Sequence, residues 1–286
     1  MKFAFIEEHL TDYPLTVVCR MLEISCSGYY AWQKRPVSLR QQRHELLTAR
    51  IAVVYQENRQ VYGSPRISRA LNANGPEVCR HTVAKIMREQ NIRAKTKKKF
   101  VPQTTDSQHD YPVEKNRLDR QFDAPLPNRK WVADITYIPT DEGWLYLAGV
   151  LDLCSRKIVG WSMADHMEAS LPGEALAMAI VQCCPKAGLL HHSDRGVQYA
   201  SDHYRKLLDQ ADMEVSMSRK GDCWDNAVME SFWSTLKTEL VSHQHYATRD
   251  QAKASIFGYI EVFYNRQRLH STLGYVSPEA FEASLN

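Results

Sequence analysis

Long apolar runs are missing from this sequence of 286 residues. No stretch approaches the roughly 18 apolar residues that a membrane-spanning helix needs, because charged residues interrupt even the longest ones. The N-terminus also lacks the form of a secretory signal, since Glu7 and Glu8 come too early in it. We therefore expect a cytoplasmic protein without a membrane partner.

The cysteines lack any pairing pattern. They number seven, and no Cys-x-x-Cys pair occurs. This pattern predicts neither a disulfide framework nor a zinc site, and it suits a reducing compartment. The content of 44% hydrophobic and 24% charged residues is typical of a globular protein long enough for two domains.

The net charge is only +3, but the basic residues are unevenly distributed. They cluster in the first hundred residues and end in a run over 93–99 that includes Lys97 and Lys98. Such a run is suited to follow a phosphate backbone, or it forms a solvated tail, and the sequence leaves both open.

The N-terminal third is predicted to be all helical, with a helix-turn-helix-like segment over 1–36 and a second helix-turn-helix domain over 37–99. In the second, Ser64-Pro65 marks one helix start, and a recognition helix is expected near 81–90. The expected DNA contacts of this region are Arg66, Arg80, His81 and Lys85, together with Lys97 and Lys98. The alternative is a small helical domain whose charged face is merely solvated.

A proline-rich polar stretch over 100–129 indicates a linker, and the character of the sequence changes after it. Strands rich in β-branched and aromatic residues are predicted at 131–138, 145–152, 157–163, 189–192 and 214–217. Helices are expected between the later strands, over 224–240 and over 249–266. We predict an α/β catalytic core over 130–240, with a mixed five-stranded sheet flanked by helices, and a helical extension over 241–286.

Three acids stand out by their positions. Asp134 lies in the middle of a strand, where an ionised group must be solvated, paired or bound to a metal. Asp194 follows the end of a strand, where α/β sheets usually carry their sites. Glu230 lies on a helix, on the same side as Asn226 and Lys237. Taken singly, each acid is equally well explained as structural or merely solvated; Asp152, on another strand, we interpret as structural.

The residues around these acids carry a family resemblance. The segments are Trp131-x-x-Asp134-Ile-Thr-Tyr, His192-Ser-Asp194-Arg-Gly-Val-Gln-Tyr199, Asp225-Asn-Ala-x-x-Glu230-Ser-Phe-x-x-x-Leu-Lys237 and Tyr264-Asn265-Arg266-x-Arg268-x-His270-Ser271-x-Leu273-Gly274-Tyr275-x-Ser277-Pro278. They resemble the motifs of insertion-sequence transposases with a retroviral-integrase-like core. More narrowly, the chain resembles the second-frame product of the two-frame IS-three group over nearly its whole length, including the segment 62–67.

The resemblance implies a ribonuclease-H-like core in which Asp134, Asp194 and Glu230 are catalytic and hold two Mg²⁺ or Mn²⁺ ions when DNA is bound. Two ions of this kind serve in-line displacement at phosphorus. Lys237 and Asn226 are then expected near the DNA. For His192, contact with DNA, orientation of Asp194 and a satisfied position at a strand end stay open.

The expected partners are the terminal inverted repeats of the element, target DNA, and at least a second copy of the chain on DNA. The sequence departs from the families that it resembles in two ways. It has no His-His-Cys-Cys zinc module of the retroviral-integrase kind, and it has no leucine heptad before the first helix-turn-helix. The group's first-frame product typically supplies the heptad, so a fusion with that product is a possible active species. Two alternative functions stay open: a DNA-binding regulator without catalysis, and a ribonuclease-H-like nuclease without joining activity.

Overall fold

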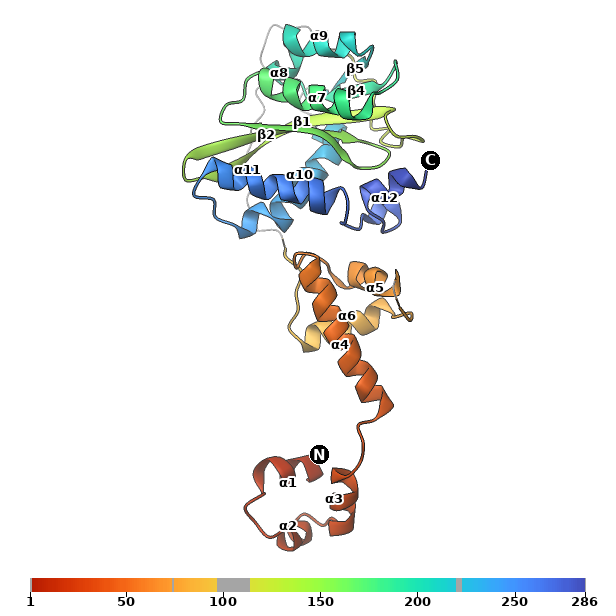
Figure 1. Ribbon diagram of the computed structural model, residues 1–286, viewed down its shortest axis with the longest axis vertical. Coiled ribbons are helices and arrows are strands. Elements are labelled where there is room, and N and C mark those ends of the chain that lie inside the picture. The colour runs from red at the N-terminus through yellow and green to blue at the C-terminus, as the bar shows by residue number, and fades with distance from the viewer. Residues whose placement is uncertain (1, 74, 97–113, 220–222, 286) are drawn as a thin grey trace. The chain divides into compact units, whose positions relative to one another are not determined.

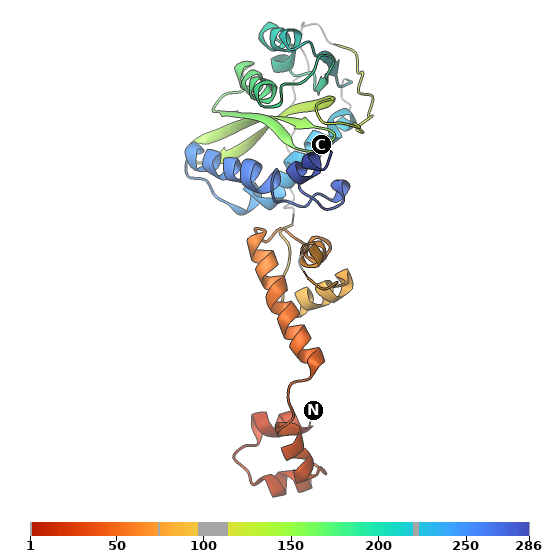
Figure 2. The same ribbon diagram turned by 45° about the vertical axis from the view of Figure 1, so that its right-hand side comes forward.

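The computed structural model describes residues 2–73, 75–96, 114–219 and 223–285. Contacts between residues divide the chain into two units, Met1–Val53 and Val54–Asn286. Figures 1 and 2 show the elements of each unit along the colour gradient. Helix α4 (Leu39–Glu57) begins in the first unit and ends in the second.

The first unit contains three short helices before α4, as the sequence predicts: α1 (Lys2–His9), α2 (Leu15–Met21) and α3 (Cys26–Gln33). Their small core is formed by Ile6, Val18 and Tyr29, one from each helix. Ser25 caps α3, because its side chain accepts a hydrogen bond from Gly28 N at 2.8 Å. The pair α2 and α3 therefore has the expected helix-turn-helix-like order.

The second unit opens with the end of α4 and with helices α5 (Ser64–Ala73) and α6 (Arg80–Glu89). Apolar residues at helical spacing bury one face of each helix, among them Ile67 on α5 and Val83 on α6. The turn between the helices is held by Asn72, whose side-chain oxygen accepts a hydrogen bond from Val78 N at 2.8 Å. The helix predicted near 81–90 is thus present as α6, and its polar residues face outward.

A mixed sheet of five strands forms the centre of the unit, in the order β3-β2-β1-β4-β5. The strands are β1 (Lys130–Thr140), β2 (Gly143–Asp152), β3 (Ile158–Ala164), β4 (Leu190–Ser193) and β5 (Glu214–Met217). The first three are antiparallel, while β4 runs parallel to β1 and to β5. This arrangement confirms the predicted sheet.

Helices cover both faces of this sheet, with α7 (Ser170–Cys183) and α9 (Asp202–Gln210) on one side, and α10 (Ala227–Glu239) and α11 (Arg249–Phe257) on the other (Figures 1 and 2). A short helix, α8 (Val197–Ala200), follows β4. Gly160 on β3 allows α7 to approach closely, because a methyl group there would collide with the Ala175 carbonyl and with Ala179. The apolar faces of the sheet are thereby buried on both sides.

The C-terminal part packs tightly against the sheet. The helix predicted over 249–266 is present, but its second half is a π-helix, η3 (Gly258–Tyr264). Short 3₁₀ turns lie at η1 (Cys223–Asn226), η2 (Val241–His243) and η4 (Ser271–Leu273), and α12 (Pro278–Ala283) follows. The Asn265 side chain accepts from Ile158 N and donates to Ile158 O, both at 3.0 Å, and so extends the edge of β3.

The stretch predicted as a linker contains no helix or strand over its described part, 114–129. It is nevertheless anchored to the sheet rather than merely connecting two domains. Leu118 is buried, and the backbone N–H groups of Arg117 and Leu118 both donate to the Ser216 hydroxyl on β5. Within the described ranges, no helix is long and apolar enough to cross a membrane.

Candidate active site

Asp134 lies in the middle of β1, opposite Gly149 on β2, as its motif predicts. The side chain is half-buried. Its Oδ2 atom accepts a hydrogen bond from the indole N–H of Trp233 on α10, with 3.0 Å between the heavy atoms. The carboxylate therefore lies between the sheet and the helix that carries Glu230.

Asp194 follows directly after β4, and the strand register brings it to Asp134. The last pair of the parallel β1–β4 ladder is Val132 with His192, and two residues further along both chains come Asp134 and Asp194. Asp194 Oδ1 accepts a hydrogen bond from Gly196 N at 2.9 Å, which fixes the turn that follows the strand. The end of β4 thus places a second carboxylate beside the first.

Glu230 occupies the first turn of α10 and is exposed. The helix is held against the sheet by the buried residues Met229, Phe232 and Leu236 on its other side. Burial of the carboxylate against its surroundings raises the pKa of Glu230. The predicted helical face is therefore confirmed for Glu230.

The three acids are electrostatically linked. Burial, followed by the nearby charge of Asp194 and then that of Glu230, raises the pKa of Asp134 from 3.8 to about 8, although the Trp233 hydrogen bond acts in the opposite direction. No basic side chain is among the leading contributions to this pKa. The charges that contribute most to the pKa of Asp134 are therefore those of two other acids.

This donor set fits hard divalent cations, which prefer carboxylate oxygens. In the part of the chain that the structure describes, no three histidine, cysteine, aspartate or glutamate side chains are already arranged to hold a metal ion. Glu230 is exposed, whereas Asp134 is half-buried. Asp134 and Asp194 form the nucleus of the site, and Glu230 is the acid available to complete it.

Two of the expected DNA contacts are buried instead. His192 is fully buried, and its ring nitrogens contact the hydroxyls of Ser216 and Ser218 at 2.8 and 3.1 Å. Burial lowers the pKa of His192 to about 4, so the ring is neutral near pH 7. Asn226 is also buried, and its amide donates to the carbonyl of Ala133 at 3.1 Å. The structure does not fit direct DNA contact by either residue, since each side chain is enclosed.

Arg66 also departs from expectation. Its Nε donates to the carbonyl of Leu269 at 2.9 Å, and its Nη1 lies 3.9 Å from the carboxylate of Glu239. Beside it, the Tyr62 hydroxyl accepts a hydrogen bond from Leu269 N at 2.7 Å. The segment 62–67 therefore contacts the C-terminal motif, and this arginine points at protein rather than at solvent.

The other expected contacts stay accessible where the structure describes them. Arg80, His81 and Lys85 are exposed on α6. Lys237, two turns after Glu230, is half-buried, and its amine lies 5.0 Å from the ring centre of Tyr137. Lys97 and Lys98 lie outside the described residues.

Sequence reasoning found the acids but missed the residues that hold them. Trp233 follows Glu230 by three positions and faces Asp134, yet its motif position carried no assignment. Gly149 was missed because a lone glycine in a strand gives no signal of what approaches it. The interpretation of Asp152 as structural agrees with its contacts, since it is buried and accepts hydrogen bonds from backbone N–H groups of Asn128, Cys154 and Ser155.

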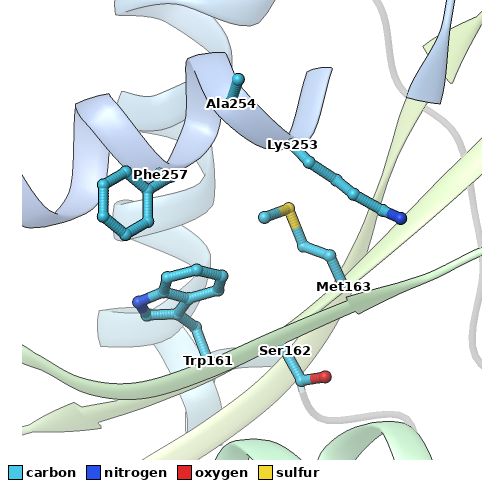
Figure 3. A pocket seen from close by; sticks show the side chains of 6 residues that line it. All are labelled: Trp161, Ser162, Met163, Lys253, Ala254 and Phe257. Atoms are coloured by element: carbon cyan, nitrogen blue, oxygen red, sulfur yellow. The ribbon is translucent and has the colours of Figure 1, made fainter. Parts of the chain in front are cut away.

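One shallow hollow lies between β3 and α11. It has a volume of about 420 Å³ and is lined by Trp161, Ser162 and Met163 of β3 and by Lys253, Ala254 and Phe257 of α11 (Figure 3). Figure 3 shows the rings of Trp161 and Phe257 on one side of it and Lys253 on the other. None of the three acids lines it.

Comparison with known proteins agrees with this arrangement. Family models described as "Integrase core domain" match residues 124–223 and 211–278, and one described as "HTH-like domain" matches residues 41–100. The chain is 47% identical over 264 residues to the insertion element IS600 uncharacterized 31 kDa protein of Shigella sonnei, covering 92% of this chain and 97% of that one. It is 42% identical over 284 residues to the transposase InsF for insertion sequence IS3A of Escherichia coli (strain K12), covering 99% and 98%.

Solved structures give more distant matches. A simian T-cell lymphotropic virus intasome in complex with PP2A regulatory subunit B56 gamma matches with 16% identity and a TM-score of 0.47, covering 75% of this chain and 70% of that one. The HTLV-2 integrase catalytic core domain in complex with magnesium matches with 14% identity and a TM-score of 0.43, covering 56% and 99%. At these scores the structures carry no argument about function.

The integrase core and the acids of its sheet define the class, which is that of the DDE-type polynucleotidyl transferases on a ribonuclease-H-like fold. The curated relatives narrow this class further, because they match over nearly the full chain. The chain belongs to the IS3 family of insertion-sequence transposases, and its function is DNA transposition.

Proposed function

We propose that this transposase nicks DNA at the ends of its own element and joins the freed ends to target DNA, with Asp134, Asp194 and Glu230 as its catalytic residues. One observation carries the proposal. The carboxylates of Asp134 and Asp194 lie together at the end of β4, and the pKa of Asp134 is raised without a basic side chain among the leading contributions. Such a pair is stabilised when a cation joins it.

Mg²⁺ or Mn²⁺ would be held by the carboxylates of these three residues. A bound pair of such ions neutralises the attacking and leaving oxygens of in-line displacement at phosphorus. The nucleophile is water for cleavage and a DNA 3′-hydroxyl for joining, so the chain need not supply one. Its own residues hold the carboxylates in place and bind the DNA backbone.

Lys237 is the proposed contact of α10 with the phosphate backbone. It follows Glu230 by seven residues, which returns it to the same side of the helix. Its amine lies over the ring of Tyr137 on β1, 5.0 Å from the ring centre. A point charge of this kind steadies a phosphate without reading the sequence.

The remaining partners belong to the same proposal. Arg80, His81 and Lys85 on α6 would contact the terminal inverted repeats, because they form the exposed polar side of a helix-turn-helix. Since an element has two ends, we propose a dimer or a larger assembly on DNA. The first-frame product, or a fusion with it, is a further proposed partner, and the bacterial cytoplasm is the proposed location.

The test follows nicking and strand transfer on a labelled duplex that carries the element's end, with purified protein and Mg²⁺. Glu230→Gln should lower product formation by about a thousandfold or more, because a lost ligand removes several kcal/mol of transition-state stabilisation. Glu279→Gln, which alters an exposed ion pair with Arg266, is the matched control and should keep full activity. Binding of the duplex should be unchanged in both variants.

Products that persist in Glu230→Gln would overturn the assigned role of this residue. Duplex binding without products in any variant would point to a regulator or to a protein that requires its first-frame partner. Repeating the assay with the fused protein separates these two results.

A further inference from the structure

Helix α10 carries Glu230, and its placement against β1 decides where that acid lies. The exposed carboxylate is at the helix surface, so its distance from Asp134 is set by how α10 is attached to the sheet. Two side chains of this helical region form hydrogen bonds to consecutive residues of β1, and they flank Glu230 in sequence.

The first of these is Trp233, three residues after Glu230. Its indole N–H donates to Asp134 Oδ2 at 3.0 Å, and its side chain is only 6% exposed, so water does not compete well for this hydrogen bond. Because the indole is rigid and its N–H can only donate, it holds the carboxylate in one orientation.

The second is Asn226, four residues before Glu230. Its amide donates to the carbonyl of Ala133 at 3.1 Å, and the side chain is buried. The hydrogen bond reaches the residue directly before Asp134, whereas that of Trp233 reaches Asp134 itself. The segment with Glu230 is therefore attached to β1 on both sides of this acid.

Gly149 supplies the space for this attachment. It pairs with Asp134 across the β1–β2 ladder. A Cβ atom at this position would lie 2.7 Å from Met229 Cε and 2.9 Å from Trp233 Cη2, closer than real side chains pack. Any larger residue would push the indole away from the carboxylate.

We propose that Trp233 is a positioning residue of the active site: with Asn226 and Gly149 it fixes the Asp134 carboxylate and sets its separation from Glu230. The inference rests on the proposed function, since it matters only if these acids share ions. Hydrogen bonds from second-sphere residues orient ligands, and losing one typically lowers metal affinity or activity about 10- to 100-fold.

The test compares two tryptophans in the full chain. Trp233→Phe and Trp161→Phe each remove an indole N–H that donates to a carboxylate, but the partner of Trp161 is Glu261, at 2.6 Å, and not one of the three acids. Mn²⁺ is titrated against the DNA-free protein while its thermal unfolding is followed, because a ligand of the folded state raises the midpoint. Nicking of the element's end is measured over the same range of Mn²⁺.

Trp233→Phe should raise the Mn²⁺ concentration for the half-maximal thermal shift about tenfold. The Mn²⁺ concentration for half-maximal nicking should rise by a similar factor. Trp161→Phe should match the wild type in both, even where the two variants lose similar stability without metal. Equal Mn²⁺ dependence in the two variants would overturn the inference.

A second pair of variants keeps the test decisive if Trp233→Phe folds poorly. Gly149→Ala should also raise the Mn²⁺ concentration for the half-maximal thermal shift. Gly63→Ala should leave this concentration unchanged, because its new methyl group meets only Pro65 Cδ at 3.8 Å. Unchanged Mn²⁺ dependence in Gly149→Ala would also contradict the inference. A wild-type protein that neither nicks nor responds to Mn²⁺, alone or fused, would instead overturn the proposed function.

Discussion

The two ends of α10 carry glutamates in opposite surroundings. Glu239, at its C-terminal end, is 7% exposed. Arg268 donates to it from Nε and Nη2 at 2.8 and 2.7 Å, and the Tyr259 hydroxyl donates at 2.7 Å. Glu230, at the N-terminal end, is exposed and belongs to a group of acids. One helix thus holds a carboxylate that is fully paired and another that is not.

The difference separates structural from functional acids by their partners rather than by their burial. A buried carboxylate with an arginine and a hydroxyl has its hydrogen bonds satisfied, and it joins segments of the chain. Burial lowers the pKa of Arg268, but the hydrogen bonds and charge of Glu239 outweigh it and raise the pKa overall. For Asp134, burial and then the charges of Asp194 and Glu230 raise the pKa, and the Trp233 hydrogen bond does not outweigh them. Only this second arrangement leaves a place for a cation.

The largest effect on stability is expected from removing the ion pair between Glu239 and Arg268. Glu239→Gln leaves the Arg268 guanidinium buried without its counter-charge, which destabilises proteins by about 3–5 kcal/mol. Urea unfolding of the full chain measures this change. Glu279→Gln at the exposed pair with Arg266 should change stability by less than about 1 kcal/mol. A similar loss of stability in both variants would contradict the larger effect expected for the buried ion pair of Glu239 with Arg268.

Asp134, the acid on β1 that lies near Glu230, should make stability depend on pH in the opposite sense from most carboxylates. The folded-state pKa of Asp134 is about 8, above its ordinary value of 3.8, so the folded protein binds a proton more tightly than the unfolded chain. Stability without metal therefore falls as pH rises from about 4 to about 8. Asp134→Asn should remove part of this slope and stabilise the protein at pH 8 by on the order of 1–2 kcal/mol, after allowance for solvent screening.

Thermal unfolding at a series of pH values, with chelator and then with Mg²⁺, measures this effect. Added Mg²⁺ should restore stability at pH 8 in the wild type but not in Asp134→Asn. A pH profile that the substitution leaves unchanged would contradict the raised pKa.

The smallest effect concerns two arginines of the helix-turn-helix. Arg66→Ala removes the hydrogen bond to Leu269 and should lower stability by about 1 kcal/mol, measured by urea unfolding. Arg80→Ala, on the exposed side of α6, should leave stability unchanged and weaken binding of the element's end. The slope of the logarithm of the DNA-binding constant against the logarithm of the salt concentration should become less steep by about 0.9, the value for one phosphate contact. If Arg66→Ala lost as much DNA affinity as Arg80→Ala and kept its stability, Arg66 would have to be counted among the residues that contact DNA.

The elements were predictable because their signals are local. The β-branched stretch around Asp134 predicts β1, and the Ser64-Pro65 start and the spacing of Val83 predict α5 and α6. The acids were predictable because each lies in a distinctive motif. Their surroundings were not, since Gly149 and Trp233 are 84 residues apart and give no sign in the sequence that they meet.

Three of the expected DNA contacts have protein partners in the structure, and they share one cause. His192, Asn226 and Arg66 are polar residues in or near motifs, and from sequence alone a polar residue near a site suggests contact with a ligand. The structure gives each a partner from a distant segment: Ser216, Ala133 and Leu269. The described part of the predicted linker, 114–129, likewise has a distant partner, because the backbone N–H of Leu118 donates to Ser216 on β5.

The sequence by itself determined the order of helices and strands, the three candidate acids and the family, because periodicity and motifs are carried by neighbouring residues. Only the tertiary structure decided which acids are paired. Glu239 meets Arg268, whereas Asp134 meets Asp194 and Trp233, because the parallel β1–β4 ladder and the packing of α10 bring distant segments together. The charge that surrounds a carboxylate depends on those contacts, and with it the difference between a structural acid and a catalytic one.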